Sequence, residues 1–436
     1  MLARASSGAL ALLLALAGCD KLRAFPGFDP ARAVPPPGPP AVALGPWLIE
    51  PRAGQVTIAW TTLEPSVGRV WYGAREPDRL ATEDGPAGTD HRVVLASLQP
   101  STQYRYRVEG APDAAWFTSA PAQGSEGPIH VVVYGENQTN NGDHALVVRA
   151  AAAERPQLLL HTGNMVASAR EEPLWRVWFA EERDLLAHSP IVAAPGSQEI
   201  TDQGAAYTRD FQRRGMPAYV SLEYGPVHVV VLDSWELAAG ATAQKGAVSE
   251  AQKAWLEEDL RRVPEERHVW VVVNEGPWSH AKDERMAGSE NVRSAILAAH
   301  KVHPIEVVFS GRRRFYERGD IFGIRYLILG GGGAPLEEPD PSAPGVQAAA
   351  PALSFAAVDV CGCHTTGRVK DITGKVIDAF TLADCATPCS VPGAQVAAAT
   401  PVAAPAQDAA PSRKRSRRRR GGSLDGSRRA AENRDR

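Results

Sequence analysis

The sequence has little net charge and no long hydrophobic run. Lysine and arginine total 47 and aspartate and glutamate total 50, which gives a formal net charge of −3 over 436 residues. So small a charge gives no reason to expect a nucleic-acid partner for the body of the protein. The apolar run from Ala9 to Ala17 is too short to span a bilayer as a permanent helix. The length of the chain suits two or three packed domains.

The first residues have the order of an export signal. Arg4 supplies a positive charge, residues 9–17 are apolar, and Leu16-Ala17-Gly18-Cys19 follows directly. This order predicts a signal peptide over residues 1–18. The small residues before Cys19 resemble the lipobox of bacterial lipoproteins, which implies that Cys19 becomes the acylated N-terminus. A plain secretory signal followed by an incidental cysteine is the alternative.

A proline-rich stretch comes soon after Cys19. Residues 30–40 read Pro-Ala-Arg-Ala-Val-Pro-Pro-Pro-Gly-Pro-Pro, which should extend as a semi-rigid polyproline spacer. We therefore expect residues 19–42 to tether a folded body to a membrane. The lipobox-like motif implies a bacterial cell envelope, with the protein lipid-anchored at the inner or outer membrane and either periplasmic or surface-exposed.

The other cysteines are Cys361, Cys363, Cys385 and Cys389, all late in the chain. An exported protein meets oxidising conditions, so these four residues are expected to form disulfides. Because a Cys-x-Cys pair is too close to bridge itself comfortably, Cys361 and Cys363 should each pair with Cys385 or Cys389. A structural zinc site that includes His364 is the alternative.

Residues 43–122 show the period-two alternation of short strands. The apolar positions are Val56, Ile58 and Trp60, then Val67, Val70 and Tyr72, then Val93 and Leu95, then Tyr104, Tyr106 and Val108. Short strands separated by Gly, Pro and Asp turns predict an all-β sandwich. The run from Leu98 to Tyr106 resembles the corner and strand of fibronectin type III domains.

Residues 127–386 change to apolar runs that alternate with helical stretches. Strands are expected at 129–134, 158–161, 191–194, 227–232, 269–273, 305–309 and 324–329, and helices at 249–262 and 290–300. This alternation predicts an α/β domain with strands buried on both faces. Ligands of such domains bind beyond the carboxyl ends of strands, so the functional residues should follow the apolar runs.

The last segment, residues 387–436, is rich in Ala and Pro and contains the basic run 413–420. This composition predicts a disordered tail. It is interpreted either as a solvated linker or as a contact for anionic envelope polymers or lipid head groups.

Five segments follow apolar runs and carry glycines at regular places: Tyr134–Gln138, His161–Val166, Pro195–Glu199, Val271–Trp278 and Ser310–Arg318. Their order and spacing resemble the five blocks of the calcineurin-like metallophosphoesterases. With the fibronectin-like region in front, residues 43–384 are similar to the bacterial purple acid phosphatases. The stretches 223–228 and 330–336 match as well. The resemblance implies an N-terminal sandwich followed by an α/β metallophosphoesterase-like β-sandwich flanked by helices.

The same resemblance implies a dinuclear Fe, Zn or Mn centre that clamps a phosphate ester while a metal-bound hydroxide attacks phosphorus. The family's ligand positions nevertheless carry other residues here. The first Asp is Glu136, the bridging Asp is Asn164, the tyrosine ligand is Ala167, the Asn ligand is Ser197, the His that assists the leaving group is Gln198, the fourth-block His is Asn274, and the two His of the last block are Arg312 and Arg314.

These departures predict a catalytically inactive pseudo-phosphatase with no metal cofactor. Amides cannot bridge two cations with useful strength, and guanidinium groups have no lone pair to donate. Loss of so many ligands should abolish metal binding. One alternative is an active phosphomonoesterase with a remodelled metal site built from Glu199, Glu275, His161, His144 and His280.

The arginines leave two further interpretations open. Arg312, Arg313 and Arg314 could replace the lost metal charge and bind a phosphate-containing or other anionic ligand. They could equally pair with Glu136, Glu199 or Glu275 and seal the site. The function expected first is a silent envelope lipoprotein, held at the membrane by Cys19, that binds such a ligand or a protein partner. A purely structural envelope protein is the remaining alternative.

Overall fold

The computed structural model describes residues 40–138, 141–212, 216–236, 246–282 and 287–385. The expected signal peptide, the expected lipidation site Cys19, the tether up to residue 39, Cys389 and the basic tail lie outside these residues. Among the described residues, no helix combines the length and the apolar character needed to cross a membrane.

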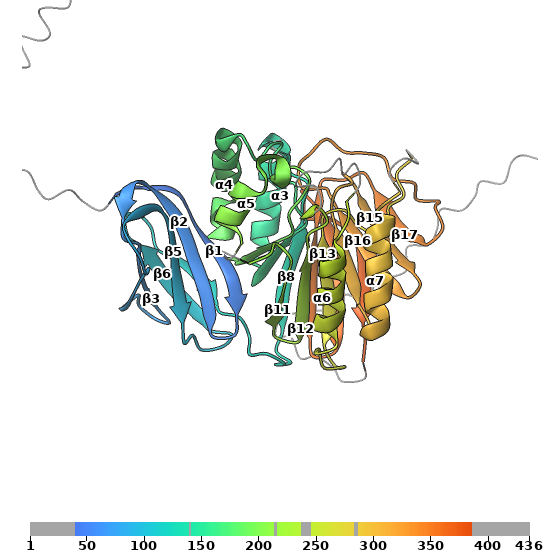
Figure 1. Cartoon of the computed structure of the whole chain (residues 1–436), viewed down its shortest axis with the longest axis horizontal. Helices are drawn as coiled ribbons and strands as arrows, with labels where there is room; N and C mark the ends of the chain where they lie inside the picture. Colours follow the sequence, from blue (N-terminus) through green and yellow to red (C-terminus); the bar gives the residue numbers. More distant parts are fainter. Residues whose placement is uncertain (1–39, 139–140, 213–215, 237–245, 283–286, 386–436) are drawn as a thin grey trace, which may run out of the picture. The chain divides into compact units, whose positions relative to one another are not determined.

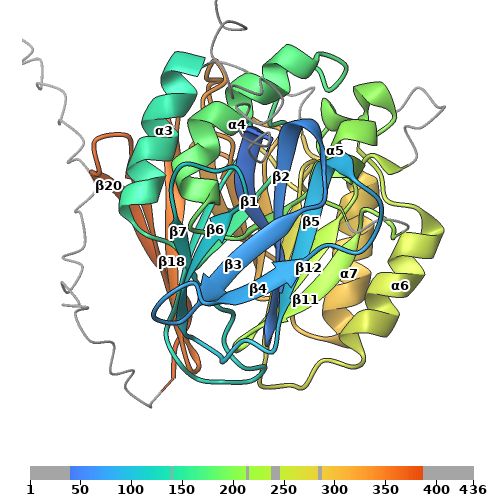
Figure 2. The ribbon, with the colours of Figure 1, turned by 90° about the vertical axis from the view of Figure 1, so that its left-hand side faces the viewer.

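The first two sheets form a β-sandwich of seven strands (Figure 2). One sheet has the order β1–β2–β5 and the other β4–β3–β6–β7. The strands are β1 (Val42–Arg52), β2 (Gln55–Ser66), β3 (Arg69–Gly73), β4 (Arg79–Thr82), β5 (Gly88–Ala96), β6 (Gln103–Val108) and β7 (Ala115–Thr118). The predicted strand positions are found, except that Val67 lies before β3. The Tyr104 hydroxyl accepts a hydrogen bond from the Gln99 N–H at 2.9 Å and ties the corner before β6 to this strand.

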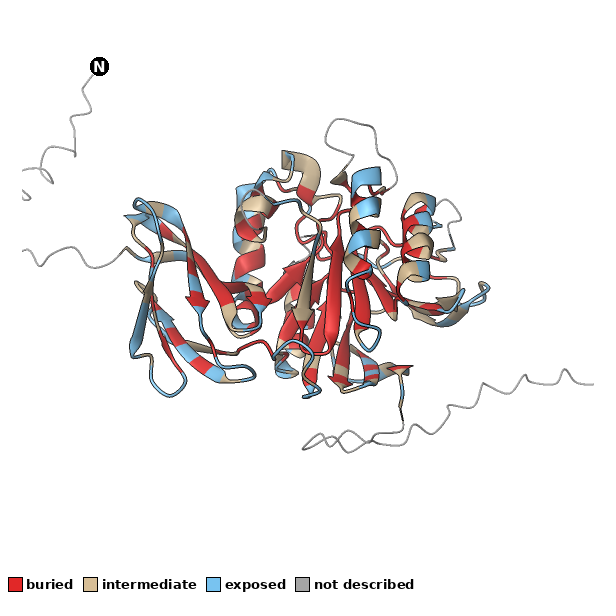
Figure 3. Cartoon of the chain, turned by 60° about the horizontal axis from the view of Figure 1, so that its bottom comes forward, coloured by how far each residue is buried: buried red, intermediate tan, exposed pale blue. Residues whose placement is uncertain are grey.

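Two larger sheets follow, and their strands are mostly buried on both faces (Figure 3). One sheet has the order β10–β9–β8–β18–β19–β20 and the other β11–β12–β13–β14–β16–β15–β17. The bounds are β8 (Ile129–Tyr134), β9 (Leu158–His161), β10 (Ile191–Ala193), β11 (Val220–Tyr224), β12 (Val227–Leu232), β13 (His268–Val273), β14 (Val307–Ser310), β15 (Tyr316–Ile321), β16 (Ile324–Leu329), β17 (Val346–Ala350), β18 (Ser354–Cys361), β19 (His364–Asp371) and β20 (Val376–Ala383).

The valine-rich runs explain why these sheets face each other. Alternate residues of β12, such as Val229 and Val231, enter the core between the sheets, and their neighbours Val230 and Leu232 enter the core on the outer face. A strand that is apolar on both faces must be covered on both, which favours a layered arrangement. β14 starts at Val307, two residues later than expected.

Helices cover the outer face of each sheet. The six-stranded sheet carries α3 (Asn141–Ala153), α4 (Glu172–Leu186), α5 (Ala205–Asp210) and the short 3-10 turn η1 (Glu199–Asp202). The seven-stranded sheet carries α6 (Glu250–Leu260) and α7 (Glu290–Val302), which lie side by side in Figure 1. Ser249 and Ser289 cap α6 and α7 by accepting hydrogen bonds from Gln252 and Val292. These caps explain why both helices begin where the sequence predicts.

The N-terminal sandwich of β1 to β7 packs against the helices that cover the six-stranded sheet. The Trp47 ring lies 4.5 Å from the Phe179 ring of α4, and its indole N–H donates to the Asp210 carbonyl at 3.0 Å. Trp47 and Ile49 of β1 belong to the same buried cluster as the aromatic residues of α4. β1 is therefore part of two cores.

One disulfide joins Cys363 to Cys385, as expected for one of the two pairs. Cys361 is also disulfide-bonded. The bond links the β18–β19 turn to the chain just beyond β20. Because Cys363 and Cys385 are oxidised, they are not available as zinc thiolates.

A charged cluster joins β11, β12 and α6. His228 contacts Glu223 and Asp259, each at 2.9 Å. Burial lowers the pKa of His228, but the hydrogen bonds and charges of Asp259 and Glu223 outweigh it and raise the pKa to about 9. His228 is therefore protonated at neutral pH, as the counter-ion of two carboxylates.

This cluster predicts a pH-dependent stability. Because folding raises the pKa of His228, the protonated His228 stabilises the folded protein. This stabilisation is complete when the pH is below the unfolded-state pKa of about 6.5, and it is lost as the pH rises through about 9. Between pH 7 and pH 10 the wild type should lose on the order of 2 to 3 kcal/mol more unfolding free energy than His228→Gln. Urea unfolding measures this difference. His188→Gln, at a histidine bonded to the main chain of Trp116, is the control, and equal losses in wild type and His228→Gln would contradict the prediction.

Candidate functional site

The expected ligand positions meet at the carboxyl ends of neighbouring strands. Glu136 follows β8, Asn164 follows β9, and Asn274 and Arg312 follow β13 and β14. Because β8 to β10 are parallel to one another and β12 to β14 likewise, these ends lie together at one edge of the two sheets. The block alignment made from the sequence therefore corresponds to a single site.

Glu136 is the centre of this site, and its side chain is completely buried. The Asn164 amide donates to both carboxylate oxygens, at 2.8 and 3.0 Å. Asn274 donates at 2.9 Å, the Arg312 backbone N–H at 2.7 Å and the Gln138 amide at 2.8 Å. The carboxylate thus lies within a shell of hydrogen-bond donors.

The orientation of each asparagine is fixed by its other partners. The Asn164 oxygen accepts the Gln198 backbone N–H at 2.9 Å and the Ser197 hydroxyl at 3.3 Å. The Asn274 oxygen accepts the Trp235 indole N–H at 3.0 Å. Because these partners donate, both amide oxygens point away from Glu136 and both NH2 groups point toward it. Neither asparagine therefore has its amide oxygen next to Glu136, where a cation would need it.

Two buried carboxylates have raised pKa values here. Burial raises the pKa of Glu136, although the hydrogen bonds from Asn164, Arg312 and Asn274 oppose the rise. Burial also raises the pKa of Glu199 to about 7. Glu199 accepts the backbone N–H groups of Asn164, Met165 and Gly196 at 2.7 to 2.9 Å. Glu199 therefore holds two loops of the site together through their main chains.

The backbone of the site adopts a conformation that side chains disfavour. Glu136, Asn164 and Arg312 have φ values of 64°, 56° and 66°. Such left-handed residues cost free energy unless the surroundings fix them. Gly163 has φ 90°, and a Cβ there would lie 2.8 Å from the Ala194 carbonyl oxygen. The close approach of these loops explains the glycine in that block.

The three arginines pair with glutamates at the edge of the site. The Arg312 Nε lies 3.3 Å from Glu275, and an Arg313 nitrogen lies 3.4 Å from the same carboxylate. The Arg312 guanidinium also lies 5.5 Å from the Trp235 ring centroid. Arg314 pairs instead with Glu337, at 2.8 Å.

The histidines proposed for a remodelled metal site are engaged elsewhere. His161 and His144 both bond to Asn137, each at 2.7 Å. Burial lowers the pKa of His161 to about 3. Burial also lowers the pKa of His144, but Glu182 at 3.2 Å outweighs it and the net pKa is raised. His280 pairs with Glu317 at 2.8 Å, so these three histidines do not converge with Glu136.

These residues do not fit a dinuclear metal centre. A pair of cations needs anionic oxygens and neutral imidazoles. The site offers Glu136 with its oxygens already hydrogen-bonded, two amides that present NH2 groups, and an arginine. Ala167, at the position of the tyrosine ligand, is exposed. Within the described ranges, no group of three His, Cys, Asp or Glu side chains is placed to hold a metal ion.

Several contributors have no signal in the sequence. Trp235 orients Asn274, and Glu337 binds both the side chain and the backbone N–H of Arg314. Both come from segments outside the five blocks. Gln138 lies within the first block, but its contact with Glu136 follows only from the left-handed turn between them.

The donor shell predicts that Glu136 is essential for stability. Glu136→Ala leaves buried donors without an acceptor, at about 1 to 3 kcal/mol for each unsatisfied group, and should lower the unfolding free energy by about 3 kcal/mol or more. Glu136→Gln keeps one acceptor oxygen and should cost less. Urea unfolding of both variants is compared with Glu76→Ala, at an exposed glutamate of the sandwich. An equal stability for Glu136→Ala and Glu76→Ala would show that the shell is not stabilising.

Comparison with known proteins gives relatives of one kind. No protein-family model matches the chain. Purple acid phosphatase 21 of Arabidopsis thaliana is 27% identical over 268 residues, which cover 57% of this chain and 59% of the relative. The phosphoenolpyruvate phosphatase of Allium cepa is 25% identical over 324 residues, which cover 66% of this chain and 65% of the relative. The chain thus spans about three fifths of the length of these relatives.

Solved structures show the same fold. The purple acid phosphatase PPD1 of yellow lupin, Lupinus luteus, superimposes with a TM-score of 0.65 at 15% identity, over 78% of this chain and 74% of that one. A structure of PhoD gives a TM-score of 0.61 at 12% identity, over 80% of this chain and 94% of that one. The sheets and helices described above therefore form a purple acid phosphatase-like metallophosphoesterase fold.

Proposed function

We propose that this chain is a catalytically inactive pseudo-phosphatase of the cell envelope, which uses a phosphatase-like scaffold for binding. The front sandwich would be a fibronectin type III-like module that supports the larger domain. The lipobox-like motif at Cys19 supports export and lipid anchoring in a bacterial envelope.

The observation that carries this proposal is the hydrogen-bonded state of Glu136. Its charge is balanced by amide and backbone donors that occupy the space around both oxygens. A cation could approach only if Asn164 and Asn274 turned over, and each is held by other partners on its oxygen. These hydrogen bonds stabilise the buried carboxylate without any metal ion.

The residues that would perform the chemistry are also unsuitable. Gln198, at the position of the acid that assists the leaving group, has no proton that titrates near neutral pH. The Arg312 guanidinium lies next to Glu275 at the mouth of the site, and its positive charge disfavours a cation nearby. Both features oppose phosphate-ester hydrolysis by the family mechanism.

The arginine pairs favour the sealed form of the site over an anion-binding form. Arg312 and Arg313 share Glu275, and Arg314 is bound twice by Glu337. A phosphate would have to replace carboxylates that are already in place. We therefore place the binding function of the chain elsewhere than at Glu136.

The first test is metal content together with turnover. The full-length mature protein, incubated with Fe, Zn or Mn and desalted, should carry less than stoichiometric metal by mass spectrometry and should not hydrolyse p-nitrophenyl phosphate. Glu136→Gln is the control for a contaminating phosphatase, whose activity the substitution would leave unchanged. Stoichiometric metal with turnover that Glu136→Gln abolishes would refute the proposal.

The second test addresses the arginines. Inorganic phosphate titrated calorimetrically should give no saturable heat with the wild type, because the guanidinium groups are already paired. Arg312→Ala should lower the melting temperature, since Glu275 then loses a partner. Saturable phosphate binding that disappears in Arg312→Ala and Arg314→Ala would instead assign anion binding to this site.

A further inference from the structure

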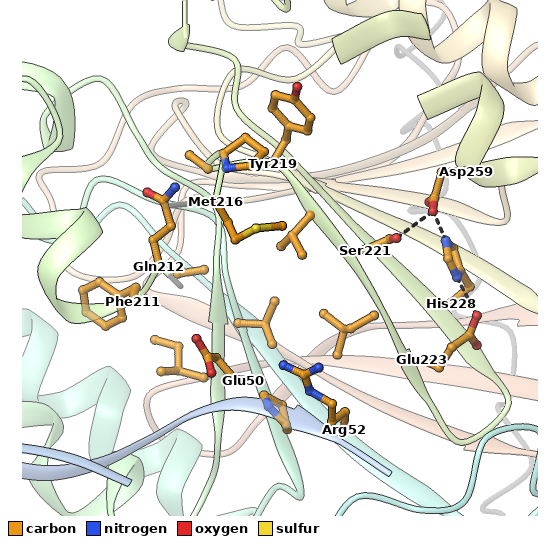
Figure 4. Close-up of a pocket in the computed structure, with 18 of the residues that line it drawn as sticks. Glu50, Arg52, Phe211, Gln212, Met216, Tyr219, Ser221, Glu223, His228 and Asp259 are labelled. Carbon is orange, nitrogen blue, oxygen red and sulfur yellow. Dashed lines mark hydrogen bonds and ion pairs between the residues drawn. The ribbon is translucent and has the colours of Figure 1, made fainter. Parts of the chain in front are cut away.

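A cavity lies apart from the Glu136 site. It has a volume of about 720 Å³ and lies between the end of β1, the edge strands β10 and β11, and residues 211–212 and 216–219 (Figure 4). None of Glu136, Asn164, Asn274 or Arg312 lines it. Its size falls in the range of small-molecule sites, which often form where two packed units meet. We name it the β1/β11 cavity.

One wall of the β1/β11 cavity is apolar. Ile191 and Val192 of β10 line the cavity together with Val220 and Leu222 of β11. Phe211 lies at one side of it in Figure 4. Val220 is 44% exposed, although it is a large apolar side chain. Apolar surface that is left open in this way gains free energy when a ligand covers it.

The polar wall opposite Phe211 consists of side chains that contact one another, and one oxygen of Glu223 has no hydrogen-bond partner among the described residues. Ser221 donates to Asp259 at 2.8 Å, and His228 is held between Asp259 and Glu223. Both ring nitrogens of His228 therefore face carboxylates, and neither can take a proton from Ser221. This geometry excludes a serine nucleophile activated by histidine. The wall is a structural cluster that borders the cavity.

The remaining charges of the lining leave one uncompensated group. Glu50 accepts the Thr57 hydroxyl at 3.0 Å and lies 3.8 Å from Arg92. Arg262 pairs with Glu258 at 2.6 Å. Arg52, which lies beside Glu50 in Figure 4, is exposed and makes no side-chain hydrogen bond or ion pair within the part of the chain that the structure describes. Of the charged lining residues that the structure describes, Arg52 is therefore the one whose side chain is left without a partner.

We propose that the β1/β11 cavity binds a single aliphatic chain that ends in a carboxylate. The chain would cover Val220, Leu222 and the β10 residues, and the carboxylate would accept two hydrogen bonds from the Arg52 guanidinium, whose planar fork matches it. The inference depends on the cavity alone and holds whether or not the Glu136 site binds metal.

Dodecanoate, below its micellar concentration, is the probe, and its binding to the full-length protein is measured by titration calorimetry. The wild type should bind with a saturable isotherm. Arg52→Gln should bind at least about tenfold more weakly, because the glutamine amide can replace at most one of the two charge-assisted hydrogen bonds. Val220→Asn should also bind more weakly, because it places an amide against the chain. Arg75→Gln, at an exposed arginine outside the cavity, should bind as the wild type does.

Dodecyltrimethylammonium separates charge recognition from adsorption of any amphiphile. It should bind much more weakly than dodecanoate, since Arg52 repels its head group. Each variant is first checked for an unchanged circular dichroism spectrum. The proposal is overturned if the wild type gives no saturable isotherm, if the cationic amphiphile binds as tightly as dodecanoate, or if Arg52→Gln and Arg75→Gln bind equally well.

Discussion

A carboxylate buried without a cation must find its compensation in hydrogen-bond donors, and this requirement organises the centre of the molecule. Glu136 has no contact with water, so each of its lone pairs needs a partner. The partners are side-chain amides and a backbone N–H, at positions where the sequence resemblance predicts acidic or imidazole metal ligands. The substitutions therefore act as a set. One asparagine facing a metal would weaken the site, whereas two asparagines facing a carboxylate make a stable neutral shell around a single charge.

The loops around this shell keep their shape through backbone contacts. The left-handed backbone at Glu136, Asn164 and Arg312 and the crowding at Gly163 are properties of strand ends that meet closely. Glu199 fixes two of these loops through main-chain hydrogen bonds that do not depend on side-chain identity. The scaffold can accordingly retain its shape while the chemistry of the side chains changes, because the strain is compensated by backbone contacts rather than by metal coordination.

Much of the fold and part of the site could be predicted from the sequence. Runs such as 227–232 are apolar on both faces and so read directly as buried strands, and Ser249 marks the start of its helix. The block order brought Glu136, Asn164, Asn274 and Arg312 to one place. The sequence does not show how these side chains are oriented or which partners they contact. The orientation of the Asn274 amide depends on Trp235, and the partner of Arg314 is Glu337. Arg52 and β11 line the same cavity, although they are far apart in the sequence. Lipidation at Cys19 and the role of the basic tail belong to segments outside the described residues, and they stay predictions.

The placement of Trp47 bears on how the chain behaves mechanically. Its ring is packed among the aromatic residues of α4, although it belongs to the front sandwich. Pulling the sandwich away would expose this indole and break its bond to the Asp210 carbonyl. The sandwich is therefore a poor candidate for a freely pivoting spacer. Force applied through the N-terminal end of the chain would reach the larger domain through β1, and the two parts should melt in a single cooperative transition.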